Sequence, residues 1–441
     1  MPDDLILDQA RDLLAYIDAS PSPYHAVAET ARRLAAAGFT EVSEVEAWPI
    51  APGRHFVMRG GSLVAWAGDA GVAASGAGFR VVGAHTDSPN LRIKPHPDVV
   101  GPNWRQLGVE VYGGVLLNSW LDRDLGLSGR VTVLGADGPG VRLFRDDRPL
   151  LRIPQLAIHL DREINQAGLK LNPQQHLSPI WGVGPGIAGQ SFVVYLADQI
   201  GVAADTVASW DVMAHDVQRG TIAGLDQEFV SSPRLDNQLS CWAGLRALVG
   251  GDAGARALAS ESSDRPVAVV ALFDHEEIGS QSATGADSEL LATTLERIVL
   301  AGGGDRAGFL RAVAASRCVS ADGAHATHPN YPDRHDPQHT VRLNAGPVLK
   351  HNANVRYATD AVTAARFAET CRGVGVPLQH FVSRNDMPCG STIGPITAAR
   401  LGIATVDVGV AQLAMHSARE LCGSADPALF VQALTAFLHT P

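Results

Sequence analysis

"PVAVVALFDHEEIGS" (residues 266–280) is an apolar run that ends in four ionisable side chains, Asp274, His275, Glu276 and Glu277. The run carries almost no polar atom, which is typical of a strand that is buried on both faces of a sheet. Such strands alternate with helices in α/β domains. Ligands of open α/β sheets gather beyond the carboxyl ends of the strands, so the four polar groups indicate a site at this strand end.

Similar alternation of helical and strand-like patterns occurs in two separate parts of the chain. Apolar residues with helical spacing occur at 5–17, 20–38, 236–251 and 359–375, and a further helix is predicted within 389–402. Strand-like runs occur at 61–68, 79–88, 266–273, 316–323, 378–383 and 403–410. These patterns predict an α/β fold, with a mixed sheet flanked by helices.

The middle of the chain has a different texture. From about residue 96 to residue 228, apolar and polar residues alternate in short runs that are separated by Gly and Asp turn residues, as in half-exposed antiparallel strands. We therefore predict a discontinuous α/β domain formed by residues 1–95 and 229–441, interrupted by an inserted β-rich domain at 96–228. A chain of 441 residues is also longer than one ordinary core requires.

Composition narrows the class of protein. The formal net charge of −11 disfavours nucleic acid as a partner, because that partner requires many Lys and Arg contacts to phosphate. No apolar stretch is long enough to span a bilayer, so we predict no membrane partner. The N-terminus is acidic and amphipathic, unlike a signal peptide. Five scattered cysteines without CxxC spacing fit reduced thiols, and the predicted location is the cytoplasm.

A His-x-Asp pair follows the strand-like run that ends in Gly83 and Ala84. His85 and Asp87 are two positions apart, so in an extended chain they point to the same face. A ligating imidazole usually needs a carboxylate beside its other ring nitrogen or beside the metal, and the pair therefore suits a metal site. Taken alone, it is more often a turn or a hydrogen-bonded surface pair.

Three further segments place candidate ligands near strand ends. Asp236 stands just before a predicted helix, where an acid is usually only a cap. His416 lies beyond the last buried strand, where a lone histidine is more often structural. The loop after residue 320 either binds metal or is solvated, and its candidates are Asp322, His325, His328 and His335.

The candidates share a position at the ends of strands of one predicted sheet. Imidazole nitrogens with carboxylate oxygens suit Zn²⁺, and also Mn²⁺ or Co²⁺. The set is larger than one tetrahedral ion needs, which favours two ions that share a bridging carboxylate, activate water and stabilise an oxyanion. The ligand candidates in this set are His85, Asp236, Glu276 or Glu277, Asp322 and His416.

The adjacent acids fit this site, because neighbouring side chains on an extended segment point in different directions. One of Glu276 and Glu277 can bind metal while the other acts as general base. H-E-x-x-H is excluded, since Gly279 stands four residues after His275. Cys389 stands where a nucleophile elbow needs its first glycine, so G-x-S-x-G is absent as well.

These motifs together resemble the aspartyl aminopeptidases, dinuclear zinc exopeptidases that remove N-terminal Asp or Glu from peptides. The resemblance runs in the family's order from Ser22 to His416. Its segments are "GAHTDSPNLRIKP", "RLDNQ", "FDHEEIGS", "SADGAHATHPNYPDRH", "GPVLKHNANVRYATD" and "PCGSTIGPI".

The resemblance implies a role for each matching residue. It implies that two Zn²⁺ bind to each chain, with His85 and Asp322 on one ion, Glu277 and His416 on the other, and Asp236 bridging both. It further implies that Glu276 is the general base and that Asp87 orients His85. His159 matches a histidine that reaches a neighbouring subunit's active site, where it binds substrate or transition state and sometimes metal. Lys350 matches a lysine near the acidic side-chain pocket.

Lysine usage agrees with that last assignment. Only three of 35 basic side chains are lysine, namely Lys94, Lys170 and Lys350. Arginine-rich codon usage accounts for most of this bias, but a retained lysine is favoured where a compact ammonium is needed. The resemblance also implies that residues 96–228 form a dimerisation domain, and that dimers assemble into a homododecamer that admits only peptides.

Three functions are compatible with these patterns. The first is an aminopeptidase for acidic N-termini, with Glu276 as the base for a metal-activated water and Lys350 selecting the acidic side chain. The second keeps the same site but acts as a broader aminopeptidase or an N-acyl amidohydrolase. The third is a non-catalytic, self-assembling scaffold, which loss of Glu276 or Asp236 would favour; both are present.

Overall fold

The chain forms two compact units in a computed structural model that describes residues 4–48, 53–184, 191–250 and 265–439. The first unit comprises residues 1–87, 220–415 and 420–441, and the second comprises 88–219 together with 416–419. No helix among these described residues is long and apolar enough to cross a membrane. The five cysteines all lie in the described ranges and are free thiols.

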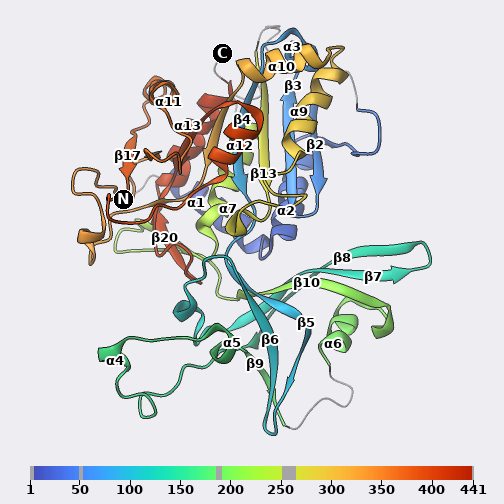
Figure 1. Cartoon of the computed structure of the whole chain (residues 1–441), viewed down its shortest axis with the longest axis vertical. Helices are drawn as coiled ribbons and strands as arrows, with labels where there is room; N and C mark the ends of the chain where they lie inside the picture. The colour runs from blue at the N-terminus through green and yellow to red at the C-terminus, as the bar shows by residue number, and fades with distance from the viewer. Residues whose placement is uncertain (1–3, 49–52, 185–190, 251–264, 440–441) are drawn as a thin grey trace. The chain divides into compact units, whose positions relative to one another are not determined.

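The first unit is built on a mixed sheet with nine strands in the described residues (Figure 1). In spatial order the strands are β1 (Thr40–Glu41), β2 (Gly53–Arg59), β3 (Ser62–Gly68), β13 (Val267–Phe273), β4 (Phe79–His85), β14 (Arg317–Ala321), β18 (Ala404–Gly409), β16 (Val348–His351) and β17 (Gln379–Val382). The central strands β13, β4, β14 and β18 are mutually parallel, so their carboxyl ends share one edge.

Helices cover both faces of this sheet, as predicted. One face packs against α1 (Asp4–Ala19), α2 (Pro23–Ala36), α7 (Leu235–Val249), α11 (Ala361–Gly373) and α13 (Asp426–His439). The other packs against α3 (Ala70–Ser75), α9 (Leu290–Ala301), α10 (Arg306–Ala315) and α12 (Ile393–Leu401). The helices predicted at 5–17, 20–38, 236–251, 359–375 and within 389–402 are confirmed as α1, α2, α7, α11 and α12, whereas α9, α10 and α13 were not predicted.

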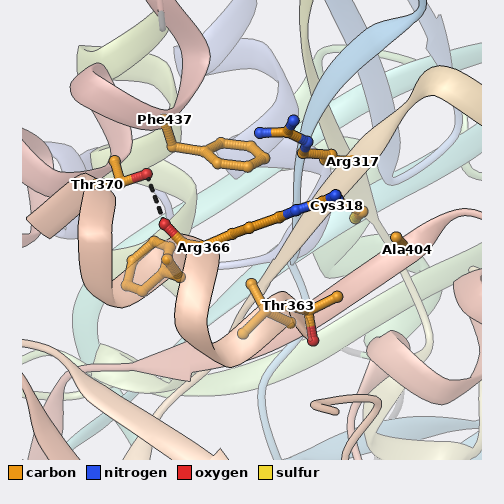
Figure 2. Close-up of a pocket in the computed structure, with 9 residues that line it drawn as sticks. Arg317, Cys318, Thr363, Arg366, Thr370, Ala404 and Phe437 are labelled. Atoms are coloured by element: carbon orange, nitrogen blue, oxygen red, sulfur yellow. Dashed lines mark hydrogen bonds between the residues drawn. The ribbon is translucent and has the colours of Figure 1, made fainter. Parts of the chain in front are cut away.

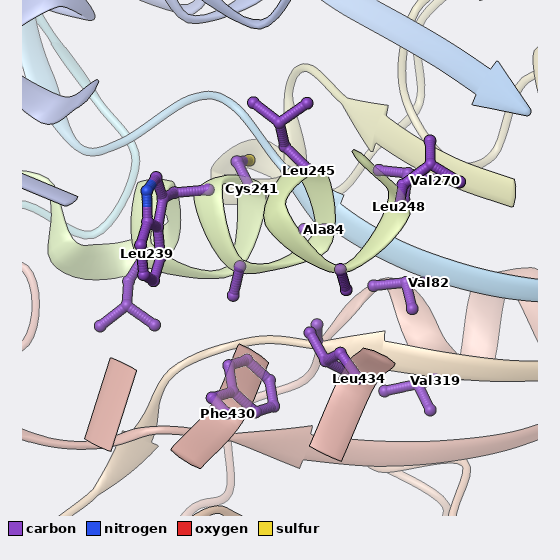
Figure 3. Close-up of a cluster of buried hydrophobic side chains, with 14 of the residues drawn as sticks. Val82, Ala84, Leu239, Cys241, Leu245, Leu248, Val270, Val319, Phe430 and Leu434 are labelled. Atoms are coloured by element: carbon purple, nitrogen blue, oxygen red, sulfur yellow. The ribbon is translucent and has the colours of Figure 1, made fainter. Parts of the chain in front are cut away.

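A core between α7, α13 and the sheet packs against the central strands. Figure 3 shows Leu239 and Leu245 of α7, Phe430 of α13, and Val82 and Val319 of the sheet in this cluster. Alternate residues of each strand point to this face. β13 is buried at every position, which confirms the prediction made from its uninterrupted apolar run.

A small sheet extends the first unit beyond β18. Its strands in spatial order are β11 (Thr221–Ala223), β12 (Phe229–Ser232), β20 (Glu420–Gly423), β19 (Ala411–Leu413) and β15 (Ala324–His325). β15 and β19 are parallel and continue directly from the ends of β14 and β18. The loop after β14 is therefore held by backbone hydrogen bonds close to the carboxyl edge.

The second unit is an antiparallel sheet of six strands in the described residues. In order they are β8 (Gly138–Leu151), β7 (Leu125–Gly135), β10 (Val207–Asp216), β5 (Asn90–Val100), β6 (Trp104–Tyr112) and β9 (Ile180–Val183). The prediction of antiparallel strands in this part of the chain is confirmed. Helix α6 (Phe192–Ile200) was not predicted; its Phe192 and Leu196 are buried in this unit's core. That this unit serves dimerisation stays a prediction.

Candidate metal centre

Five ionisable side chains of the first unit gather beyond the carboxyl ends of the parallel strands. His85 is the last residue of β4, Glu276 and Glu277 follow β13, and Asp322 follows β14. Two groups of them could each hold a metal ion, with ligand atoms within 4.8 Å of one another: His85 with Asp236 and Asp322, and His85 with Glu276 and Glu277. The parallel strands therefore bring together residues that are up to 237 positions apart in the sequence.

His85 is the centre of the cluster. Its Nε2 lies 3.3 Å from Asp236 Oδ1, 3.7 Å from Asp322 Oδ1 and 3.8 Å from Glu276 Oε2. Its Nδ1 lies 3.0 Å from the backbone oxygen of Asp87. The tautomer with the proton on Nδ1 donates to that oxygen and leaves the Nε2 lone pair for a cation, as metal-ligating histidines require.

Asp87 lies beneath the site and is fully buried. Its Oδ1 accepts a hydrogen bond from the backbone N–H of Glu276 at 3.1 Å, and its Oδ2 accepts one from the N–H of Glu277 at 3.2 Å. Oδ1 is also 3.4 Å from Nδ1 of His85, farther than the backbone oxygen of Asp87. The Asp87 carboxylate therefore fixes the acidic pair directly, whereas its backbone makes the shorter contact with His85.

Asp236 reaches the cluster from an irregular first turn of α7. Asp236 and Asn237 have non-helical φ and ψ angles, and Arg234, not Asp236, is the N-cap residue. The backbone N–H of Asp236 donates to Glu420 Oε2 at 2.9 Å, and the Asn237 side chain donates to Ala321 O at 2.8 Å. The ordinary cap function is thus wrong for Asp236, whose side chain lies beside His85 instead.

Asp274 and His275, the other members of the opening quartet, serve the local backbone. Asp274 is buried, and its Oδ1 accepts the backbone N–H of His275 at 2.9 Å. His275 has a φ of 65°, and its Nδ1 lies 2.8 Å from Ser282 Oγ. The left-handed turn at His275 separates these side chains from Glu276 and Glu277, which belong to the cluster.

The electrostatics of the cluster favour a bound cation. Burial lowers the pKa of His85, but the nearby carboxylates of Glu276, Asp236, Asp322 and Asp87 outweigh it and raise that pKa well above its usual value. Burial, with the charges of Asp322 and Asp87, raises the pKa of Glu276 to about 8. Burial and then Asp236 raise the pKa of Glu277 as well. Crowded carboxylates around one imidazole are the donor set that a divalent cation neutralises.

Lys350 lies beside this cluster and is almost fully buried. Its Nζ donates to Gly323 O at 3.0 Å and is 3.9 Å from Asp322 Oδ2. It also stands 5.0 Å from the centre of the Tyr357 ring. Burial raises the pKa of Asp407, and the nearby Lys350 charge opposes that rise. Lys350 is thus a cation held next to a predicted metal ligand.

The remaining predicted residues lie outside the two groups described above. His416 groups with the second unit, where its Nδ1 lies 3.0 Å from Gly114 O, although it follows β19 of the first unit by only three residues. His159 lies in an exposed turn of the second unit. The loop histidines shape their own loop: His335 Nε2 accepts the N–H of His328, whose Nδ1 accepts the N–H of Asn330. The roles of His416 and His159 stay predictions.

Sequence patterns did not indicate two supporting residues. Glu420 is 3% exposed and holds the backbone of Asp236. Cys241 donates its thiol to the backbone oxygen of His85 at 2.9 Å. The only sequence signal for Glu420 was an acid four residues after His416, and Cys241 looked like an ordinary helix residue.

A histidine and several carboxylates at the carboxyl edge of a mixed α/β sheet define a metal-dependent hydrolase centre. The family model of the aminopeptidase I zinc metalloproteases (M18) matches residues 16–438. A probable M18 family aminopeptidase 2 from Streptomyces coelicolor is 54% identical over 429 residues, covering 97% of each chain. The chain therefore belongs to the M18 family of zinc metalloproteases, and its activity is that of an aminopeptidase.

Solved structures give the same fold. The chain in a cryo-EM structure of an Ape4 and Nbr1 complex matches with a TM-score of 0.93 and 38% identity, over 100% of this chain and 87% of that one. The mApe1 dodecamer of S. cerevisiae matches with a TM-score of 0.82 and 30% identity, over 98% and 96%. The prediction of a metallo-exopeptidase with a mixed sheet flanked by helices is thus confirmed.

Proposed function

We propose that this M18 aminopeptidase removes N-terminal Asp and Glu from peptides, with two zinc ions per chain and Glu276 as the general base. The observation that carries the proposal is the convergence of His85, Asp236, Glu276, Glu277 and Asp322 beyond parallel strands. His85 and Asp322 would hold one ion, Glu277 and His416 the other, and Asp236 would bridge them. Mn²⁺ or Co²⁺ also suits these ligands.

The bound ions would supply Lewis acidity for the scissile carbonyl and lower the pKa of water. The protein's own groups do the rest. Glu276 takes a proton from the attacking water and passes it to the leaving amine. The Asp87 carboxylate keeps the Glu276 backbone in place through the 3.1 Å hydrogen bond, so the base is held before substrate arrives.

Lys350 is the residue that we assign to acidic specificity. Its buried ammonium is 3.9 Å from Asp322 Oδ2, so a cationic group stands next to the site where the substrate's first residue would bind. An ammonium has three N–H donors, and the one bonded to Gly323 O leaves donors for a substrate carboxylate. A charge-assisted hydrogen bond of this kind would favour Asp and Glu over neutral residues.

The assembly we propose is a homododecamer built from dimers. The solved mApe1 structure is a dodecamer. In this chain, the second unit exposes large apolar side chains around the turn that carries His159, with Leu156 57% and Leu160 75% exposed. Exposed apolar patches mark protein contacts, so we assign this turn to a neighbouring subunit, with His159 binding substrate there. Light scattering tests the assembly, and a monomer would contradict it.

The base is tested by replacing Glu276 with Gln. The variant should retain the metal content of the wild type, since glutamine keeps the shape of the side chain, while turnover falls by about 10²-fold or more. Glu369→Gln, at an exposed position on α11, is the matched control and should retain full turnover. Undiminished turnover in E276Q would remove Glu276 from the base role.

The substrate class is tested with Asp-, Glu-, Leu- and Ala-anilides, extended with N-acetyl amino acids. The proposal predicts faster hydrolysis of the acidic anilides, and Lys350→Met should reduce that preference while Lys94→Met leaves it intact. Equal rates for Asp- and Leu-anilides would show a broader aminopeptidase. Cleavage of the N-acetyl compounds would favour an amidohydrolase.

A further inference from the structure

A pocket lined by arginine and apolar side chains lies at the opposite edge of the same sheet, where the parallel strands begin. It contains about 320 Å³ of space free of protein atoms, part of it open to solvent. Its walls come from β14, β18, α11 and α13, and include Arg317, Arg366, Thr370 and Phe437 (Figure 2). Its enclosed part, about 30 Å³, has room for roughly two water molecules, so most of this space is open to solvent.

Arg317 and Arg366 line this pocket, and Arg80 lies close enough for their charges to lower its pKa. We call it the arginine pocket after these three residues. Arg80 and Arg317 are paired in register on the parallel strands β4 and β14, so their side chains leave the same face of the sheet side by side. Figure 2 shows the Arg366 side chain extending from α11 toward Arg317. Like charges placed opposite each other on neighbouring strands destabilise a sheet.

Arg80 is the most deeply buried of the three, with 5% of its surface exposed. Its contacts with the backbone oxygens of Phe79 and Ala315 are long, at 3.4 and 3.5 Å. Burial, and then the charges of Arg317 and Arg366, lower the pKa of Arg80 to about 10. A buried guanidinium with weak hydrogen bonds and two cationic neighbours is costly unless an anion compensates it.

Within the described residues, none of the three forms an ion pair with a carboxylate, whereas Arg33 and Arg59 of the same unit do. Asp360 is near enough to Arg366 that the positive charge of Arg366 contributes, after the hydrogen bonds of Thr363 and Val362, to lowering the pKa of Asp360. However, Asp360 caps α11 and accepts the backbone N–H groups of Val362 and Thr363. The described protein thus supplies three positive charges here without a matching acid.

We propose that the arginine pocket binds a phosphate-type oxyanion. Guanidinium groups present planar pairs of N–H donors that match phosphate oxygens, and they bind phosphate through two parallel hydrogen bonds. Phe437 adds an apolar wall beside these donors. Inorganic phosphate and the phosphoryl group of an organic phosphate share this chemistry, and the aromatic wall favours the second of these sources.

Calorimetric titration of the full-length protein with inorganic phosphate and with phenyl phosphate, at constant ionic strength set with chloride, tests the proposal. Arg317→Met should weaken phosphate binding about tenfold or more, since it removes a charge-assisted contact. Arg372→Met, on the exposed side of α11, changes the net charge equally and should bind as the wild type does. Tighter binding of phenyl phosphate would identify an organic phosphate as the preferred source.

The melting temperature gives an independent test, because R317M should differ from the wild type in opposite directions in chloride and in phosphate. In chloride, R317M should be at least as stable as the wild type, because the repulsion between Arg80 and Arg317 is gone; in phosphate, it should gain less than the wild type. Arg366→Met, at an exposed position, repeats the test without altering a strand. Two results would overturn the proposal. One is that the wild type does not bind phosphate. The other is that R317M, R366M and R372M all bind phosphate as tightly as the wild type, which would place the phosphate elsewhere, such as at the metal edge.

Discussion

Replacing Asp87 with Asn tests whether one buried carboxylate positions the acidic pair Glu276 and Glu277. Asp87 accepts the backbone N–H groups of Glu276 and Glu277 at 3.1 and 3.2 Å. Asparagine keeps one acceptor oxygen and presents an amide NH₂ to the other N–H, so one buried donor loses its partner. The expected cost is about 1–3 kcal/mol. If that cost falls on the active geometry, kcat/KM drops by about 10- to 100-fold.

The assays are zinc content per chain, kcat/KM on an anilide, and thermal unfolding, each compared with Asp426→Asn. Asp426 is also a fully buried carboxylate that accepts two backbone N–H groups, from Asn344 and Gly346, but it belongs to α13. D426N should retain the zinc content and kcat/KM of the wild type. If D87N matched D426N in both zinc content and kcat/KM, the positioning role of Asp87 would be refuted.

Three further results are expected. Chelation should lower the melting temperature, because the carboxylates around His85 lose their counter-ion, and zinc at about 100 times its dissociation constant should restore about 2.7 kcal/mol; an unchanged melting curve would contradict the metal centre. Burial raises the pKa of Asp426 to about 6, although its backbone hydrogen bonds oppose the rise. Because the folded state holds this proton more tightly than the unfolded state, the free energy of unfolding should fall as pH rises from about 4 to 6. Chemical denaturation should show this slope in the wild type and a smaller one in D426N. Phe430→Ala should cost about 3–5 kcal/mol, since this fully buried ring lies in the core shown in Figure 3; a loss below about 1 kcal/mol, measured in urea, would contradict that packing.

The sequence predicted the clustering of ionisable side chains at the carboxyl edge because strand ends are local signals. A run such as "PVAVVALF" indicates both that a strand is buried and where the strand ends. Because neighbouring strands are parallel, their carboxyl ends then lie at the same edge of the sheet. His85 and Asp322 were therefore placed correctly from the runs before them. The same rule could not show which of Asp274, His275, Glu276 and Glu277 faces the cluster, because the left-handed turn at His275 decides that.

Residues that act through the backbone were harder to predict. Glu420 holds the N–H of Asp236 although the two are 184 positions apart, so no local pattern connects them. The N-cap interpretation of Asp236 followed from its place before a helix, but the first turn of α7 is irregular and Arg234 precedes it as the cap. Tertiary contacts with Ala321 and Glu420 override the usual capping preference there.

The two sites of the first unit lie at opposite ends of the same strands. β4 begins with Phe79 and Arg80 and ends with His85, and β14 begins with Arg317 and ends just before Asp322. Five residues of extended chain span about 17 Å, a distance at which two unit charges interact by about 1 kcal/mol at an effective dielectric constant of about 20. The acidic edge is therefore too distant to neutralise the arginines, and the arginines too distant to replace a metal ion. Each cluster needs a counter-ion of its own, so zinc removal should leave phosphate binding intact.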